Sequence, residues 1–296
     1  LCSIGVLVTW LIAATVAHYA LDISWQLSFL FGAIVTVTGP TVIVSMLRTV
    51  RPQTNLGNIL RWEGIIIDPI GALLAVLVYE YIISSQSAVS HTLVAFGKTI
   101  GIGLGLGMAV GYFLGITLRH NLVPHYLRNT AVLTIILAAF AGSNYFAHES
   151  GLLTVTVIGV MMANMRDVDV EDILEFKETL SVLLISGLFI LLATRLDLGA
   201  VADVGWAAAV VLFSIIFIAR PLAVFVSSIG TGLNLRELAL LSWLAPRGIV
   251  AAAVSALFSL KLEQLGYAQV EIIVPLVFLV IIATVVLQGL TAKPVA

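Results

Sequence analysis

Residues 25–48 read WQLSFLFGAIVTVTGPTVIVSMLR, an apolar stretch that carries a charge only at its last residue and is interrupted near its middle. As a helix, about 20 mostly apolar residues are enough to cross the hydrocarbon core of a bilayer. Proline has no backbone N–H and glycine adopts unusual backbone angles easily, so Thr38-Gly39-Pro40 can break such a helix. This stretch therefore predicts a membrane-spanning helix with a central interruption.

The composition of the whole chain is typical of a membrane protein. Of its 296 residues, 60% are hydrophobic and 10% are charged, and the mean hydropathy is +1.14. Soluble domains carry about 45–50% apolar and about 25% charged residues. These values exclude a soluble enzyme, a disordered protein and a nucleic-acid binder, and the net charge of −2 indicates no polyanionic partner. The single Cys2 excludes a disulfide framework and a cysteine-rich metal site, and we expect no cofactor.

Ten apolar segments are candidates for transmembrane helices, which predicts an all-helical polytopic membrane protein. Cut at charges and turn residues, the segments are 1–20, 25–48, 56–83, 96–118, 129–147, 150–164, 179–196, 202–229, 237–260 and 269–290. Their apolar runs are continuous, whereas membrane β-strands alternate. We expect one membrane domain over 1–296, with three-helix units at 1–84 and 202–290 joined by intervening helices at 96–196.

The basic residues between these segments predict the orientation. If the first segment runs outward, nine basic residues fall in inner connections and three in outer ones. The inner set is Arg48, Arg51, Arg61, Arg119, Arg128, Arg166, Lys177, Arg236 and Lys293, and the outer set is Lys98, Arg195 and Lys261. Because cytoplasmic loops carry the excess of Lys and Arg, we expect a cytoplasmic C-terminus.

Four ionisable side chains remain inside the predicted spans: Glu63, Asp68, Arg220 and Arg247. Each costs about 2.5–3.5 kcal/mol at the bilayer centre, so such groups persist when they pair with one another or face a water-filled cavity. Structural salt bridges between helices and an ion or proton pathway both remain open. Glu63 and Asp68 are five residues apart, about 140° around a helix, so they do not share a face.

Two predicted helices carry breakers in corresponding positions. TGP at 38–40 interrupts the middle helix of the first three-helix unit, and APRG at 245–248 interrupts the middle helix of the last unit. This pattern is typical of an inverted repeat with two crossed discontinuous helices, whose half-helix ends bind ions near the midplane. Arg247 could neutralise the negative helix ends that a crossing brings together. Pro69 frees a carbonyl one turn earlier, which beside Asp68 could coordinate a dehydrated cation.

Together these motifs resemble the cation/proton antiporter 1 family, which includes the bacterial NhaP-type antiporters. GAIVTVTGP at 32–40 resembles the broken helix of that family, and Glu63 and Asp68 resemble its acidic pair. Its two intramembrane arginines resemble those of IARPL at 218–222 and PRG at 246–248. The resemblance runs from about residue 5 to the end of the chain.

The resemblance implies exchange of Na+ or K+ for H+ by alternating access in a homodimer of the bacterial inner membrane. It implies that Asp68 binds the cation and the proton alternately, that the backbone at Thr38 faces the ion, and that Glu63 pairs with Arg220. Compared with the family, the chain corresponds to the fourth through the last helix. We therefore expect that three N-terminal helices and any C-terminal cytosolic domain are missing from it.

Three positions depart from the family pattern and indicate a divergent branch. Gly39 stands where an aspartate is usual, Gly64 replaces a serine, and Ile67 replaces an asparagine. Each change removes a polar group near the expected ion site. K+ is then as good a candidate for the transported ion as Na+.

The sequence thus predicts a secondary transporter and not an enzyme. We expect electroneutral exchange at Asp68, an ion site of Thr38, Gly39, Glu63 and Asp68, and a structural set of Glu63, Arg220 and Arg247. Two alternatives remain on the same scaffold. One is a cation channel or uniporter, which the lost side-chain ligands favour, and the other is a membrane sensor that transports nothing.

Overall fold

The computed structural model describes residues 1–50, 52, 54–83, 88–147, 149–165, 171–195, 205–267 and 269–295. In these residues the regular structure is helical, apart from one isolated β-bridge between Thr38 and Arg247. The chain forms two compact units. Unit 1 comprises Leu1–Tyr79 and Leu192–Ala296, and unit 2 comprises Glu80–Leu191.

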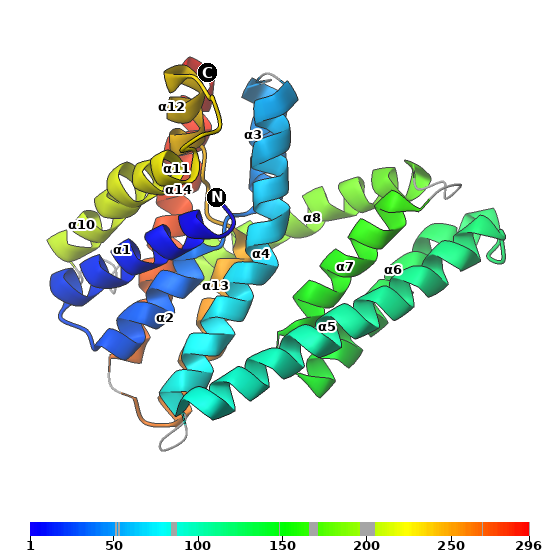
Figure 1. Ribbon diagram of the computed structural model, residues 1–296, viewed down its shortest axis with the longest axis horizontal. Helices are drawn as coiled ribbons and strands as arrows, with labels where there is room; N and C mark the ends of the chain where they lie inside the picture. Colours follow the sequence, from blue (N-terminus) through cyan, green and yellow to red (C-terminus); the bar gives the residue numbers. More distant parts are fainter. Residues whose placement is uncertain are drawn as a thin grey trace. The chain divides into compact units, whose positions relative to one another are not determined.

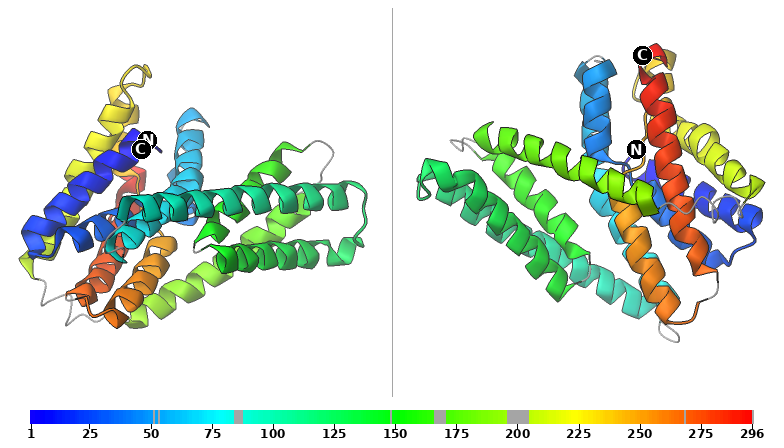
Figure 2. Two further views of the ribbon diagram at one scale, coloured as in Figure 1. Left: turned by 60° about the horizontal axis from the view of Figure 1, so that its bottom comes forward. Right: turned by 180° about the vertical axis from the view of Figure 1, so that it is seen from behind.

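Unit 1 contains the two ends of the chain and both predicted helix interruptions (Figure 1). Its first helices are α1 (Ile4–Leu21), α2 (Trp25–Thr36), α3 (Pro40–Val50) and α4 (Thr54–Ile83), the last of which belongs to unit 1 as far as Tyr79. Its later helices are α10 (Trp206–Ser214), α11 (Arg220–Ser227), α12 (Leu235–Trp243), α13 (Ile249–Gln264) and α14 (Ile273–Val295). A π-helical turn, Ile215–Ala219, joins α10 to α11, and α13 and α14 lie side by side (Figure 2).

Unit 2 is a group of helices packed through small residues. It contains α5 (Ala88–Arg119), α6 (Arg128–Phe146), α7 (Ser150–Asn164) and most of α8 (Glu171–Arg195). The α5 glycines at 103, 107, 111 and 115 recur every four residues and face α7. A Cβ at Gly107 would lie 2.9 Å from the Thr154 carbonyl oxygen, so the two backbones are in close contact.

Both interruptions occur where the sequence predicts them. The α2 helix ends at Thr36 and α3 begins at Pro40, because a residue that precedes proline is disfavoured in the helical region. The α12 helix begins in a capping box of Asn234 and Glu237 and ends at Trp243. By contrast, α4 continues through its internal proline without a break.

Each of the ten predicted segments overlaps one helix or one interrupted pair of helices, so the all-helical expectation is confirmed. Among the described residues, six helical stretches are long and apolar enough to cross a bilayer: Ile4–Leu21, Thr54–Ile83, Val94–Arg119, His125–Phe146, Trp206–Ser227 and Val270–Pro294. The apolar helices α2 and α7 are shorter, so ten crossings stay a prediction. Arg51, Arg166 and the predicted boundaries at 84, 196 and 202 lie outside the described residues.

Candidate functional site

The two interruptions of unit 1 meet backbone to backbone. Thr38 and Arg247 form an antiparallel β-bridge, in which Gly39 N–H donates to the Pro246 carbonyl oxygen at 3.0 Å. A Cβ on Gly39 would lie only 2.7 Å from the Cα of Gly248, and a Cβ on Gly248 only 2.5 Å from the Cα of Gly39. Glycine at position 39, where the resembled family has a carboxylate, therefore allows a close approach of two backbones.

One face of α4 lies against the first interruption. Gly64, Asp68 and Gly71 are spaced four and three residues apart, so they share this face. A Cβ on Gly64 would lie 3.1 Å from the Cα of Pro40, and one on Gly71 would lie 3.4 Å from the Cα of Val37. Because the glycines on both sides of Asp68 approach the interrupted segment, Asp68 lies on the face of α4 that is turned toward that segment.

Two oxygen atoms of this region have no hydrogen-bond partner among the residues that the structure describes. They are the buried Oγ1 of Thr38, a residue only 1% exposed, and the buried Oδ1 of Asp68. A buried polar atom without a partner is costly, and a carboxylate oxygen more so than a hydroxyl. A proton on the carboxyl group would remove this cost, and a bound cation coordinated by the oxygens would remove it as well.

Glu63 and Arg220 form a buried ion pair on the other side of α4. Both carboxylate oxygens of Glu63 accept from the guanidinium, from Nη1 to Oε1 and from Nη2 to Oε2, the latter at 3.0 Å. Arg220 also donates from Nε to the Leu241 carbonyl oxygen at 3.0 Å and from Nη2 to the Leu244 carbonyl oxygen at 3.3 Å. The arginine therefore neutralises Glu63 and also satisfies carbonyl groups at the C-terminal end of α12.

Arg247 binds a helix end instead of an acid. Its side chain is 3% exposed, and Nη1 donates to the Thr36 carbonyl oxygen at 3.1 Å. Thr36 is the last residue of α2, so the guanidinium lies where the helix dipole is negative. Arg220 and Arg247 thus each contact the C-terminal end of a half-helix that precedes an interruption.

Sequence reasoning missed a set of polar side chains on α14. Three hydrogen bonds join them to the second interruption: Trp243 Nε1 to Thr291 Oγ1 (2.9 Å), Ala245 N to Gln288 Oε1 (3.1 Å) and Arg247 N to Thr284 Oγ1 (3.2 Å). The spacing of 284, 288 and 291 places all three on one face of an otherwise apolar helix. That spacing was the available signal, because polar groups on a buried helix face need partners.

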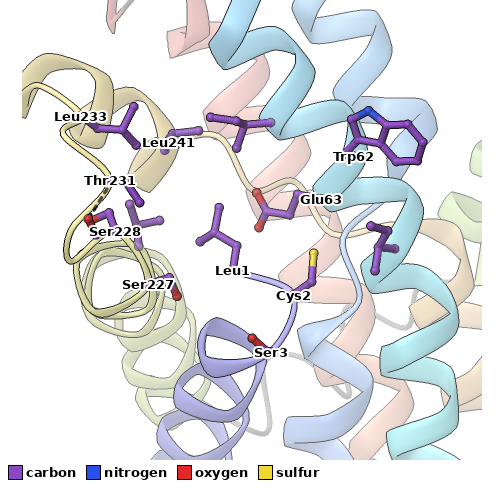
Figure 3. Close-up of a pocket in the computed structure, with 13 residues that line it drawn as sticks. Leu1, Cys2, Ser3, Trp62, Glu63, Ser227, Ser228, Thr231, Leu233 and Leu241 are labelled. Atoms are coloured by element: carbon purple, nitrogen blue, oxygen red, sulfur yellow. Dashed lines mark hydrogen bonds between the residues drawn. The ribbon is translucent and has the colours of Figure 1, made fainter.

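A cavity of about 580 Å³ is lined in part by Glu63, the carboxylate that pairs with Arg220 (Figure 3). Trp62 and Glu63 from α4 line it, together with Cys2 near the start of α1, Ser227 at the end of α11, and Thr231. Its lining is mostly apolar, with hydroxyl groups at the end of α11. The cavity reaches one of the intramembrane charges that the sequence singles out.

An all-helical chain with two paired helix interruptions and buried charges beside them has the architecture of a secondary transporter. The comparison with protein families agrees with this class. The family described as "Sodium/hydrogen exchanger, transmembrane" matches residues 1–296, and the chain belongs to this family. It is a multi-pass membrane protein of an antiporter family, as the resemblance predicts.

Curated relatives are named as antiporters of two cations. The K(+)/H(+) antiporter NhaP2 of Shewanella sp. (strain ANA-3) is 26% identical over 292 residues, which cover 98% of this chain and 50% of the relative. The Na(+)/H(+) antiporter NhaH of Halobacillus dabanensis is 25% identical over 312 residues, covering 99% of this chain and 74% of the relative. The chain thus spans about half the length of the NhaP2 relative. These relatives are transporters and not enzymes.

A solved structure has the same fold. The sodium proton antiporter MjNhaP1 from Methanocaldococcus jannaschii at pH 8 superposes with a TM-score of 0.84. The match covers 98% of this chain and 77% of the other, at 21% sequence identity. The chain therefore shares the fold of this solved antiporter, while the number of spans and the crossing of the interrupted helices stay predictions.

Proposed function

We propose that this protein exchanges a monovalent cation, Na+ or K+, for protons, and that the two compete for Asp68. The observation that carries this proposal is that one buried oxygen of Asp68 and the hydroxyl oxygen of Thr38, in the first interruption, have no hydrogen-bond partner among the described residues. A proton satisfies the carboxylate in one state and a cation satisfies it in the other. Because one site does not hold both at once, the two ions bind in exchange.

The neighbouring residues take supporting roles in this proposal. Thr38 contributes an oxygen to the cation, and Gly39 permits the close backbone approach that brings the oxygen there. Both oxygens of Glu63 are bonded to Arg220, which supports a structural role for Glu63 and leaves Asp68 as the exchanging carboxylate. Arg247 stabilises the end of α2.

The proposed architecture has ten spans in one domain over 1–296. In it, units 1–84 and 202–290 form an inverted repeat whose interrupted helices cross, and the helices of 96–196 lie between them in sequence. The β-bridge between the two interruptions supports the crossing. We further propose a homodimer in the cell inner membrane, with a cytoplasmic C-terminus and alternating access of the site to the two sides.

The test uses inverted membrane vesicles or proteoliposomes that contain the protein at its full natural length. A pH-sensitive dye reports proton movement after addition of Na+, K+ or Li+. We expect cation-dependent proton movement in the parent protein, its loss in Asp68→Asn, and its retention in Glu263→Gln, which changes an exposed carboxylate at the end of α13.

Other outcomes separate the alternatives. A cation leak without proton movement would indicate a channel. An inserted protein with no flux, in the parent and in both variants, would indicate a membrane protein whose charges are structural. Full proton movement in Asp68→Asn would exclude Asp68 as the exchanging group.

A further inference from the structure

The second interruption has an extended backbone with two different edges. On one edge, the Pro246 carbonyl oxygen accepts from Gly39 of the first interruption. On the other edge, the N–H groups of Ala245 and Arg247 point toward α14. Residues two apart in an extended segment lie on the same edge, and Pro246 between them has no N–H to satisfy.

The spacing of the α14 side chains matches this edge. Two residues of extended chain advance about 6.6 Å, and four residues of helix advance about 6 Å. Gln288 and Thr284 are four residues apart, and they accept from Ala245 and Arg247, which are two residues apart. The side chains of α14 thus accept, in matching register, from backbone N–H groups that have no intrahelical partner at the interruption.

Both acceptors are buried and ready to accept. Thr284 is 1% exposed and Gln288 is 2% exposed. The Thr284 hydroxyl donates to the Val280 carbonyl oxygen at 2.7 Å within its own helix, so its oxygen remains free to accept from Arg247 N–H. In the interior of a membrane no water is at hand to satisfy these N–H groups instead.

We propose that Thr284 and Gln288 are positioning residues for the exchange site. They hold residues 245–247 extended, and this places the Pro246 carbonyl against Gly39 and the Arg247 guanidinium against the end of α2. The first interruption, which carries Thr38, is thereby held against Asp68 through α14. This inference rests on the proposed function, because the quantity that the two residues adjust is the affinity of the site for its cation.

The test combines a structural and a functional readout on the protein at its full natural length. Amide hydrogen exchange of the peptide covering 243–248 reports on the hydrogen bonds from this segment to α14. The cation concentration for half-maximal proton movement reports on the affinity of the exchange site. The variants are Thr284→Val, which removes the acceptor, Thr284→Ser, which keeps it, and Gln288→Met. The control is Thr117→Val, since this buried α5 hydroxyl donates to the Phe113 carbonyl oxygen of its own helix and lies in unit 2.

We expect Thr284→Val to accelerate exchange in 243–248 and to raise the half-saturating cation concentration by roughly tenfold, since a buried N–H has lost its acceptor. Gln288→Met should act in the same direction, while Thr284→Ser and Thr117→Val should behave like the parent. Unchanged amide exchange in Thr284→Val would show that Thr284 does not hold the extended segment in place.

The remaining outcomes separate this inference from the proposed function. Faster amide exchange with an unchanged half-saturating concentration would overturn the positioning role, while the exchange function through Asp68 stood. A parent protein that moves no protons would overturn the proposed function, and the positioning role would fall with it. If Thr284→Val does not fold, Gln288→Met and Thr284→Ser decide the positioning role by the same two measurements. Parent-like values in Gln288→Met would then overturn it.

Discussion

At the scale of single residues, the charged groups inside the predicted spans of unit 1 have three different environments. Glu63 is neutralised by Arg220 in a two-bond ion pair, and Arg247 is stabilised by the carbonyl end of α2. Asp68 keeps one buried oxygen without a hydrogen-bond partner in the part of the chain that the structure describes. The Nε of Arg247 is also buried without a hydrogen-bond partner in the described structure, so among these groups Asp68 is distinguished as the carboxylate whose buried oxygen is open to a cation or a proton.

The Glu63–Arg220 pair leads to a prediction about stability. Glu63→Gln leaves Arg220 buried without its counter-charge, which should lower the free energy of unfolding by about 3–5 kcal/mol. Thermal unfolding in detergent measures the loss. In the double variant Glu63→Gln with Arg220→Gln, the second change should cost much less than Arg220→Gln alone. Additive losses would contradict the pairing.

The contact between Gly39 and Gly248 leads to a second prediction. Gly39→Ala places a methyl group against the Cα of Gly248 and should separate the interruptions, with a loss of stability of about 1–3 kcal/mol and of most cation-dependent proton movement. Gly57→Ala is the control, because its nearest neighbour, the Cγ of Pro52, would lie 3.9 Å away. Equal activity in both variants would show that the close approach is not required.

At the scale of secondary-structure elements, the interruptions depend on helices that surround them. Gly64 and Gly71 bring α4 against one interruption, and α14 supplies acceptors to the other. In unit 2, α5 meets α7 through a glycine face, and a second row of glycines on α5 meets nothing within 4 Å of an added Cβ in the described structure. The α5 helix therefore contains glycines packed against α7 and glycines with open space at the Cβ position.

This difference within α5 predicts opposite effects of one substitution. Gly107→Ala puts a Cβ 2.7 Å from the Cβ of Val157 and should destabilise the protein by about 1–3 kcal/mol. Gly105→Ala meets no neighbour and should be neutral or stabilising by up to about 1 kcal/mol, since alanine favours helix more than glycine does. Thermal unfolding of the two variants side by side makes the test. Equal shifts in unfolding temperature would contradict close packing of α5 on α7.

At the scale of the whole molecule, the proposed exchange moves no net charge. One carboxylate that releases one proton for one monovalent cation transfers no charge in a complete cycle. The membrane potential, which contributes about 2.3 kcal/mol per charge per 100 mV, should then not drive exchange. We expect the rate of cation-dependent proton movement in proteoliposomes to be unchanged when a potential is imposed. A rate that rises or falls with the sign of the potential would show that each transport cycle moves net charge across the membrane.

Much of the architecture could be predicted from the sequence because the relevant forces are local. The length of each apolar run determines whether a helix can span a bilayer, and proline and glycine determine where it breaks. Both interruptions therefore appear at the predicted residues. The cost of burying charge singled out Glu63, Asp68 and Arg220 for the same reason, since it depends on residue type and position in a span.

The partners of these residues are decided by packing. Arg247 and Thr36 are separated by 211 residues and Glu63 and Arg220 by 157, so no local pattern indicates which groups meet. The sequence by itself determined a helical membrane protein, its helix interruptions and the charges inside its predicted spans, because these follow from composition and local backbone chemistry. Only the tertiary structure decided that α14 accepts hydrogen bonds from the second interruption and that, among the described residues, one oxygen of Asp68 has no partner. The physical reason is that hydrogen bonding of buried groups depends on which surfaces the folded helices bring together.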